Sequence, residues 1–236
     1  MESIPLKTFV PIIYARSLLL FNLSLLPLAM QRALLTGFEP FGSYRFNPTQ
    51  ELAREYDRRT LGDIEVIGLV LPCTYYGAFE ALSESMDRLS PDLVLSMGLS
   101  SLIPRLRLEA IGRNIMNGKY ADADGVKPDC KPLVEGAQNS FRAHADVIQL
   151  AQRLHEAGVS VDVSVDAEGF ICNSLLYLTS KRIHDDKLHV RNAFFHTPWT
   201  EDYLDRIQLE PGKITVRKED LRRGIEVLLK EMGRSE

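Results

Sequence analysis

The sequence is poor in cysteine and has no concentration of basic residues. Three cysteines in 236 residues are few and odd in number, which argues against a disulfide framework and indicates a reducing compartment. The net charge is -4 and no basic run or basic-aromatic stripe is present, which argues against nucleic acid as a partner. Hydrophobic residues make up 45% of the chain, so it can bury a core of ordinary size, and its length suits one fairly large domain.

Metal-binding patterns are also missing. No set of Cys and His residues has the spacing of a zinc site. The segment around Asp122 and Asp124 resembles part of a calcium loop, but Tyr120 stands at the first ligand position. Lys131 stands at the twelfth position, where a calcium loop needs a carboxylate. The sequence therefore predicts no metal site.

The first 29 residues are strongly apolar and break the pattern of the rest. Their longest clean run, residues 17–29, is shorter than the about 20 residues that a membrane span needs. Lys7 and Arg16 precede an apolar stretch that ends in small residues, which is typical of a signal peptide. An ordered extension is a further alternative. We favour a start codon placed too far upstream, with Met30 as the first functional residue, and thus a single domain over residues 30–236.

From residue 32 onward, strand-like and helix-like segments alternate. The apolar patterns predict strands at 33–35, 64–71, 93–97, 106–115, 159–165 and 190–196. Helices are predicted at 49–58, 75–89, 143–157, 172–183 and 219–232. This alternation predicts an α/β domain with a mainly parallel twisted sheet covered on both faces. Residues 117–140 have little periodicity, and a connection of this length is usually functional.

Sites in open α/β sheets form at the carboxyl ends of strands, and four such ends carry suggestive residues. The loop GFEPFG follows the first strand, where a phosphate-binding loop would sit, but its Lys is missing and two Phe rings fill it. The other three are Gly98-Leu99-Ser100, the segment around Cys172, and His196.

Cys172 and His196 form the sharpest of these candidates. A thiol at a helix N-terminus feels the positive end of the helix dipole, which lowers its pKa and favours the thiolate. A nucleophilic Cys also needs a base, usually His, and a third group to orient that His. The residues alone leave a second interpretation open, in which Cys172 is a buried core residue and His196 a structural histidine.

Several motifs taken together resemble one known family. They are TGFEPFG at 36–42 with Asn47-Pro48, LPCTYYGAFEAL at 71–82, MGLS at 97–100, LEAIGRNIMN at 108–117, GVKP at 125–128, EGA at 135–137 and SVDAEGFICN at 164–173. From about residue 30 to about residue 203, the chain is similar to the pyroglutamyl-peptidase I (pyrrolidone-carboxylate peptidase) family of cysteine peptidases. The resemblance implies a single-domain three-layer α/β/α sandwich of the phosphorylase/hydrolase-like kind.

The resemblance also implies an activity. Members are omega-peptidases that hydrolyse the N-terminal pyroglutamyl residue from peptides through a Glu-Cys-His triad and an acyl-enzyme. The motifs assign these roles to Glu109, Cys172 and His196. They imply neither metal nor organic cofactor, N-terminally pyroglutamylated peptides as partners, and a homotetramer in the cytoplasm. A real signal at 1–29 would instead make the protein periplasmic or membrane-associated.

The two rings of the first loop gain a physical role from this resemblance. Pyroglutamate is a small, flat, neutral lactam, and an apolar slot with a few backbone hydrogen bonds suits it. Phe38 and Phe41 are expected to line that slot, together with Leu99, Phe170 and Ile171. The alternative is that Phe38 and Phe41 simply pack under the edge of the sheet.

Several positions depart from the family pattern, and two of them bear most on the candidate site. Ile103 stands where relatives usually carry Arg, while Arg105 and Arg107 lie close by but out of register. Glu168 stands where relatives have Gly. If that position needs a positive φ, Glu168 is strained there, unless the loop is shifted by one residue. These departures leave a second function open, a divergent homologue that acts as a binding or scaffold protein or hydrolyses another small acyl group.

Overall fold

The computed structural model describes residues 30–118, 120–204 and 215–234, so the apolar extension at 1–29 lies outside the described residues. A seven-stranded sheet forms its centre, in the order β2-β3-β1-β4-β9-β5-β8. These strands are β1 (Gln31–Phe38), β2 (Thr60–Leu61), β3 (Ile64–Leu71), β4 (Leu93–Leu99), β5 (Leu106–Glu109), β8 (Val161–Ser164) and β9 (Arg191–Thr197). Strands β3, β1, β4 and β9 are parallel, whereas β5 and β8 run antiparallel to β9 and β2 antiparallel to β3.

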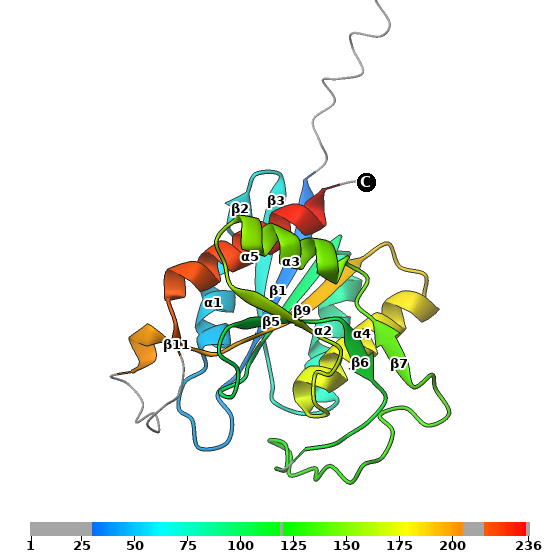
Figure 1. Cartoon of the computed structure of the whole chain (residues 1–236). Helices are drawn as coiled ribbons and strands as arrows, with labels where there is room; N and C mark the ends of the chain where they lie inside the picture. Colours follow the sequence, from blue (N-terminus) through cyan, green and yellow to red (C-terminus); the bar gives the residue numbers. More distant parts are fainter. Residues whose placement is uncertain (1–29, 119, 205–214, 235–236) are drawn as a thin grey trace, which may run out of the picture.

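Helices cover both faces of this sheet (Figure 1). One face packs against α1 (Pro48–Tyr56), α3 (Val147–Glu156) and α5 (Lys218–Gly233). The other face packs against α2 (Gly77–Leu89) and α4 (Ile171–Asp185). The predicted α/β fold with a mainly parallel sheet between helices is therefore confirmed.

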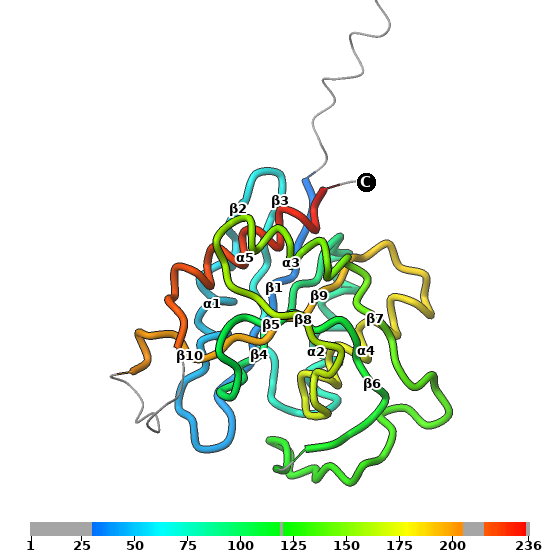
Figure 2. Tube along the Cα trace, in the orientation of Figure 1, coloured from blue at the N-terminus to red at the C-terminus, as the bar shows by residue number. Residues whose placement is uncertain are grey.

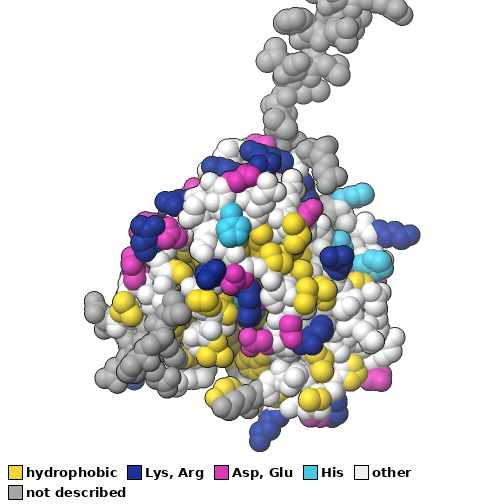
Figure 3. Space-filling view, in the orientation of Figure 1, with side chains coloured by type: hydrophobic (Ala, Val, Ile, Leu, Met, Phe, Trp, Pro, Cys, Tyr) yellow, Lys and Arg dark blue, Asp and Glu magenta, His cyan; other side chains and the backbone are white. Residues whose placement is uncertain are grey.

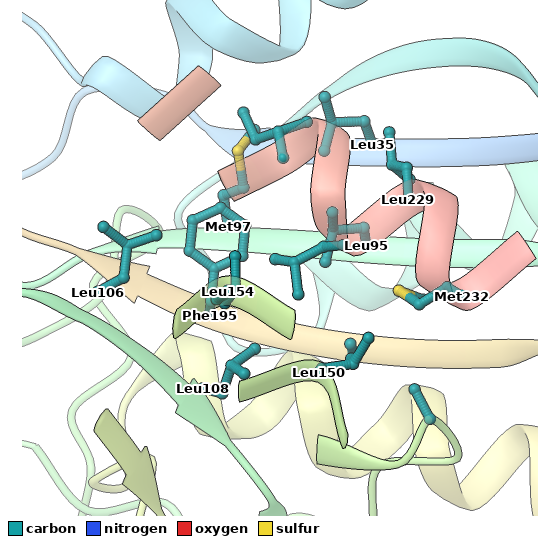
Figure 4. Close-up of a cluster of buried hydrophobic side chains, with 14 of the residues drawn as sticks. Leu35, Leu95, Met97, Leu106, Leu108, Leu150, Leu154, Phe195, Leu229 and Met232 are labelled. Atoms are coloured by element: carbon teal, nitrogen blue, oxygen red, sulfur yellow. The ribbon is translucent and has the colours of Figure 1, made fainter. Parts of the chain in front are cut away.

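The alternation of side chains along each strand divides the core into two clusters. Leu95 and Phe195 point toward α3 and α5, with Leu154 and Leu229 on those helices (Figure 4). The neighbouring Phe194 points to the opposite face, into the cluster under α2 and α4. Burial of this kind contributes about 25 cal/mol per Å² of apolar surface, so both clusters stabilise the sheet.

Some elements differ from their predicted bounds. The strand predicted at 106–115 is two strands, because β5 pairs within the main sheet whereas β6 (Ile111–Arg113) pairs with β7 (Ser140–Arg142). The helix predicted from residue 143 begins at Val147, since the Asp146 side chain accepts hydrogen bonds from the backbone N–H groups of the first turn. The sequence patterns missed β2. They also missed three very short elements near the C-terminus, namely β10 (Trp199–Thr200), η2 (Glu201–Tyr203) and β11 (Thr215–Val216).

The carboxyl ends of β1, β4 and β9 lie at one end of the sheet. The loop 39–47 and the connection 114–139 lie at that end too (Figure 2). Among the described residues, no helix is long and apolar enough to cross a membrane, and no cluster of His, Cys, Asp and Glu is arranged to hold a metal ion.

Candidate active site

Gly98 marks the point where the nucleophile and base candidates meet. Gly98 on β4 lies beside His196 on β9 in the register of the sheet. A Cβ atom on Gly98 would lie 2.7 Å from Cys172 Sγ and 3.0 Å from His196 Cδ2. Real Cβ atoms essentially never approach other atoms this closely, so the absent side chain leaves the space in which the sulfur and the imidazole lie together.

Glu109 lies behind the imidazole. His196 Nδ1 and Glu109 Oε1 are 2.7 Å apart, and the exposed fractions of the two residues are 4% and 0%. Glu109 ends β5, which pairs with β9, so two adjacent strands hold the pair. This bond leaves the opposite edge of the ring, which includes Cδ2, facing Gly98 and the sulfur.

The charge of Glu109 is set by its neighbours. Burial acts to raise the pKa of the Glu109 carboxyl, but the hydrogen bond with His196 and the charge of Arg107 outweigh it. The net pKa is therefore lowered, and Glu109 is a carboxylate at neutral pH. Arg107 Nε donates to Glu109 Oε1 at 2.7 Å, so the arginine and the histidine share one carboxylate oxygen.

Cys172 lies in the first turn of α4. The next residue, Asn173, fixes the start of this helix through its side-chain hydrogen bonds. The Asn173 side chain accepts a hydrogen bond from the Arg113 N–H at 2.8 Å and donates to the Arg113 and Ile115 carbonyls at 2.8 and 3.2 Å. Ser174 Oγ donates to the Tyr75 carbonyl. Sequence reasoning did not assign Asn173 a role, because its partners are about 60 residues away along the chain.

The protonation of Cys172 differs from the expectation. Its position at a helix start predicted a lowered pKa, whereas burial raises the pKa of the Cys172 thiol, and the charges of Glu109 and Glu168 act in the same direction. Desolvation and negative neighbours outweigh the charge of Arg107. The resting site therefore holds a neutral thiol, and all three cysteines are free.

A cavity of about 650 Å³ opens at this point. All five residues predicted for the substrate slot line it, namely Phe38, Phe41, Leu99, Phe170 and Ile171, and Cys172 and His196 form part of its wall. Glu109 does not reach the cavity. Phe38 also belongs to the core cluster under α2 and α4, so it both packs beneath the sheet edge and forms a wall of the cavity.

The family model for pyroglutamyl peptidase matches residues 31–231. The chain belongs to the pyroglutamyl peptidase family.

Individual relatives agree with that assignment. The pyrrolidone-carboxylate peptidase of Pyrococcus furiosus is 30% identical over 206 residues, covering 85% of this chain and 99% of the relative. That of Bacillus mycoides is 28% identical and covers 85% of this chain and 92% of the relative. The solved structure of the pyrrolidone carboxyl peptidase from Thermococcus litoralis matches with a TM-score of 0.80 at 28% identity, over 85% of this chain and 92% of that one.

Within this pyroglutamyl peptidase fold, hydrogen bonds hold the aromatic loop after β1. Phe38 N–H donates to Thr49 Oγ1 at 3.0 Å, and Asn47 Nδ2 donates to the Glu39 carbonyl at 3.1 Å. Asn47 also accepts a hydrogen bond from Thr49 N–H at the start of α1. These bonds hold the two ends of the loop that carries the rings of Phe38 and Phe41.

The long connection is held by an aspartate that sequence reasoning considered only as a metal ligand. Asp122 Oδ2 accepts a hydrogen bond from the Tyr75 N–H at 3.0 Å, and Oδ1 accepts from Asp124 and Val126. Asp122 therefore closes a turn and fixes it to the segment before α2. Tyr75 in turn contacts the cavity residue Phe170 edge to face, with ring centroids 5.5 Å apart.

The two departures from the family pattern have different outcomes. Glu168 has a φ of 70°, the left-handed conformation that favours glycine, so the position does require a positive φ and the loop is not shifted. Glu168 lines the cavity. Ile103 is buried outside the cavity wall, whereas the nearby Arg107 contacts Glu109.

Proposed function

We propose that this protein is a cysteine omega-peptidase that removes N-terminal pyroglutamate from peptides. The observation that carries the proposal is the meeting of Cys172 Sγ and the His196 ring at Gly98, with Glu109 bonded to the far side of that ring. Nucleophile, base and orienting group therefore stand in the order that acyl transfer requires.

The reaction begins from the thiol of Cys172. His196 accepts the thiol proton as the sulfur of Cys172 attacks the pyroglutamyl carbonyl carbon. The carbonyl electron pair moves onto oxygen, and collapse of this tetrahedral intermediate breaks the C–N bond. The leaving amine takes the proton from His196, which leaves a thioester on Cys172.

Hydrolysis of the thioester repeats these steps with water. His196 accepts a proton from water, the resulting hydroxide attacks the thioester carbonyl, and the sulfur leaves and regains its proton. Glu109 keeps Nδ1 protonated throughout and stabilises the imidazolium that forms in each half of the reaction. Every proton is returned, so the cycle needs no cofactor.

The start of α4 is the proposed oxyanion site. The first N–H groups of a helix have no acceptor within it, and no side chain caps this end at Phe170. These N–H groups lie next to the sulfur because Cys172 is the second residue of the helix. Their partial positive charge would stabilise an oxyanion at the attacked carbonyl, which typically contributes about 10²–10³ in rate per donor.

The cavity suits the proposed acyl group. Its aromatic and aliphatic walls match a flat lactam ring without a charged amino group, for which an acidic clamp would have no use. Phe38, Phe41, Leu99, Phe170 and Ile171 are the residues proposed to bind that ring.

Hydrolysis of a fluorogenic pyroglutamyl amide by the full chain tests the proposal. We expect release of the fluorophore by the unmodified protein, at least about 10³-fold faster than by Cys172→Ala. Cys130→Ala is the matched control, since this free cysteine is exposed and lies outside the cavity wall. Folded protein without turnover would refute the proposal and favour the divergent binding or scaffold homologue. The tetramer implied by the family is a separate prediction, measured by light scattering.

A further inference from the structure

Arg107 lies on the same face of the sheet as the candidate triad. It stands opposite His196 in the antiparallel pairing of β5 and β9, and it precedes Glu109 by two residues on β5. Residues two apart on a strand point to the same face. Basic and acidic side chains lie next to one another on the face of the molecule that Figure 3 shows.

The Arg107 side chain contacts two carboxylates that come from different parts of the chain. Its Nε donates to Glu109 Oε1 at 2.7 Å, and an Nη donates to Glu168 Oε1 at 3.4 Å. The side chain of Arg107 is only 19% exposed, whereas that of Glu168 is 61% exposed. Arg107 thus joins the buried acid behind His196 to the loop that precedes the nucleophile.

That loop is held in a strained conformation by further polar contacts. Glu168 N–H donates to Asp166 Oδ1 at 2.9 Å, and Arg113 donates to the Glu168 carbonyl at 2.9 Å and to the Asp166 carboxylate. A left-handed residue other than glycine persists only where its surroundings over-determine it, and such residues cluster at functional sites. Here the strain places a carboxylate in the cavity wall beside Cys172.

We propose that Arg107 is a positioning residue of the triad, which sets the working pH range of Cys172 and His196 from its place between Glu109 and Glu168. This inference rests on the proposed peptidase function. By sharing Glu109 Oε1 with His196, the guanidinium fixes the rotamer of the acid and reduces the negative charge that reaches the imidazole and the sulfur.

Arg107 is the cation that compensates the negative charges of Glu109 and Glu168 near the sulfur. The negative charges of Glu168, in the cavity wall, and of Glu109, behind His196, both act on the sulfur, and Cys73 forms another part of the cavity wall. Within the described residues, no Lys or Arg lines the cavity.

The neighbouring arginines have acidic partners of their own. Arg113 pairs with Asp166 before α4, and Arg105 pairs with Asp162 of β8 at 3.6 Å. Removing Arg107 therefore leaves two carboxylates near the sulfur without a shared counter-charge, whereas removing the charge of Glu168 leaves Arg107 balanced by Glu109 alone.

The experiment measures two pH profiles in parallel. One is the rate of Cys172 alkylation by iodoacetamide, with each cysteine quantified by mass spectrometry, and the other is kcat/KM for the pyroglutamyl amide. We expect Arg107→Gln to displace both profiles to higher pH by about one unit, because loss of a nearby cation disfavours the thiolate. Arg107→Lys should retain most of the wild-type position, and Glu168→Gln should displace both profiles in the opposite direction, by less.

Arg105→Gln is the matched control, since it removes an arginine of the same strand region that contacts neither Glu109 nor Glu168. The proposal would be overturned if Arg107→Gln lowers the rates without displacing the profiles along the pH axis. It would also be overturned if Arg105→Gln displaces them as far as Arg107→Gln does. If Arg107→Gln does not fold, as judged by circular dichroism, the exposed Glu168→Gln decides, and an unmoved profile there refutes the network.

Alkylation separates this proposal from the proposed function. A wild-type protein that alkylates at Cys172 but hydrolyses no pyroglutamyl amide would refute the peptidase assignment. The displacement of the alkylation profile by Arg107→Gln and Glu168→Gln would still test the network in that case, because alkylation needs no substrate turnover.

Discussion

The two faces of the central sheet are built from alternate residues of the same strands, yet they are stabilised differently. On the face under α1, α3 and α5, the buried cluster is made of apolar side chains such as Leu95 and Phe195 (Figure 4). On the face under α2 and α4, Glu109 and His196 are as deeply buried as those side chains, beside Phe194.

The two faces differ in how accurately they fix the positions of their side chains. Apolar packing is non-directional and tolerates repacking, whereas a buried polar group must find its hydrogen-bond partner in a defined place. The face that carries the candidate triad therefore gains accuracy of placement from its bonds in addition to the stability of packing, whereas the opposite face contributes stability alone. Variants on the two faces should separate stability from activity.

Adjacent phenylalanines on β9 make the sharpest test. Phe195→Ala should lower the free energy of unfolding by about 3–5 kcal/mol and leave kcat of the folded fraction close to wild type. Phe194→Ala should cost similar stability and also lower kcat/KM, since its ring centroid lies 5.1 Å from that of His196. Urea unfolding and assays under folding conditions measure both. Equal losses of activity in the two variants would contradict the independence of the faces.

A single methyl group at Gly98 should disturb the site more than the fold. Gly98→Ala places a carbon against Cys172 Sγ and the His196 ring, and we expect kcat/KM to fall by about 100-fold, as for a misplacement of 1 Å or so. Ser96→Ala, two residues earlier on the same strand face, is the control and should stay within a few-fold of wild type. A fully active Gly98→Ala protein would show that the site readily rearranges.

Acid should weaken the polar face selectively. The pKa of Glu109 is lowered below its ordinary 4.5 in the folded protein, because its bond to His196 and the charge of Arg107 outweigh burial. The unfolded state thus binds more protons, so the stabilisation is complete above the ordinary pKa and is lost as the pH falls through the folded value. Unfolding midpoints measured from neutral pH downward should fall less steeply for Glu109→Gln than for the wild type. Parallel slopes would count against this contribution.

The smallest expected effect concerns the strained loop. Glu168→Gly should raise the free energy of unfolding by about 1 kcal/mol, because glycine adopts the left-handed conformation without a Cβ clash. Lys187→Gly is the matched control, since Lys187 has a φ of 53° in an exposed turn far from the cavity. Both should be more stable than wild type, while only Glu168→Gly should alter the pH profile. A destabilised Glu168→Gly protein would mean that the contact with Arg107 outweighs the strain.

The sequence predicted those elements whose own residues determine them. Strand β3 (Ile64–Leu71) has the bounds predicted for it, because a continuous apolar run with β-branched residues favours a buried strand locally. The strand predicted over 106–115 was wrong as a single element, since partners from other parts of the chain divide it. Ala110 donates to the Ser164 carbonyl and accepts from Ala143, and these pairings leave no local signal.

The candidate site shows the same limit. Motifs located Glu109, Cys172 and His196, but the role of Asn173 depends on Arg113 and Ile115, and only the folded chain brings these together. The direction of the Cys172 pKa was also mispredicted, because a helix start is visible in a sequence while burial and neighbouring carboxylates are not. Arg107 was noted as out of register with the family, and only the pairing of β5 with β9 shows what it contacts.

The left-handed backbone at Glu168 has a consequence for the gene. Both glutamate codons become glycine codons by a change of the middle base alone, so one point mutation relieves the strain at this position. A random library selected only for thermal resistance should therefore yield Glu168→Gly repeatedly and early. The same library selected for turnover should retain the glutamate. The residue encoded at position 168 would therefore show whether a selection acts mainly on thermal stability or on activity.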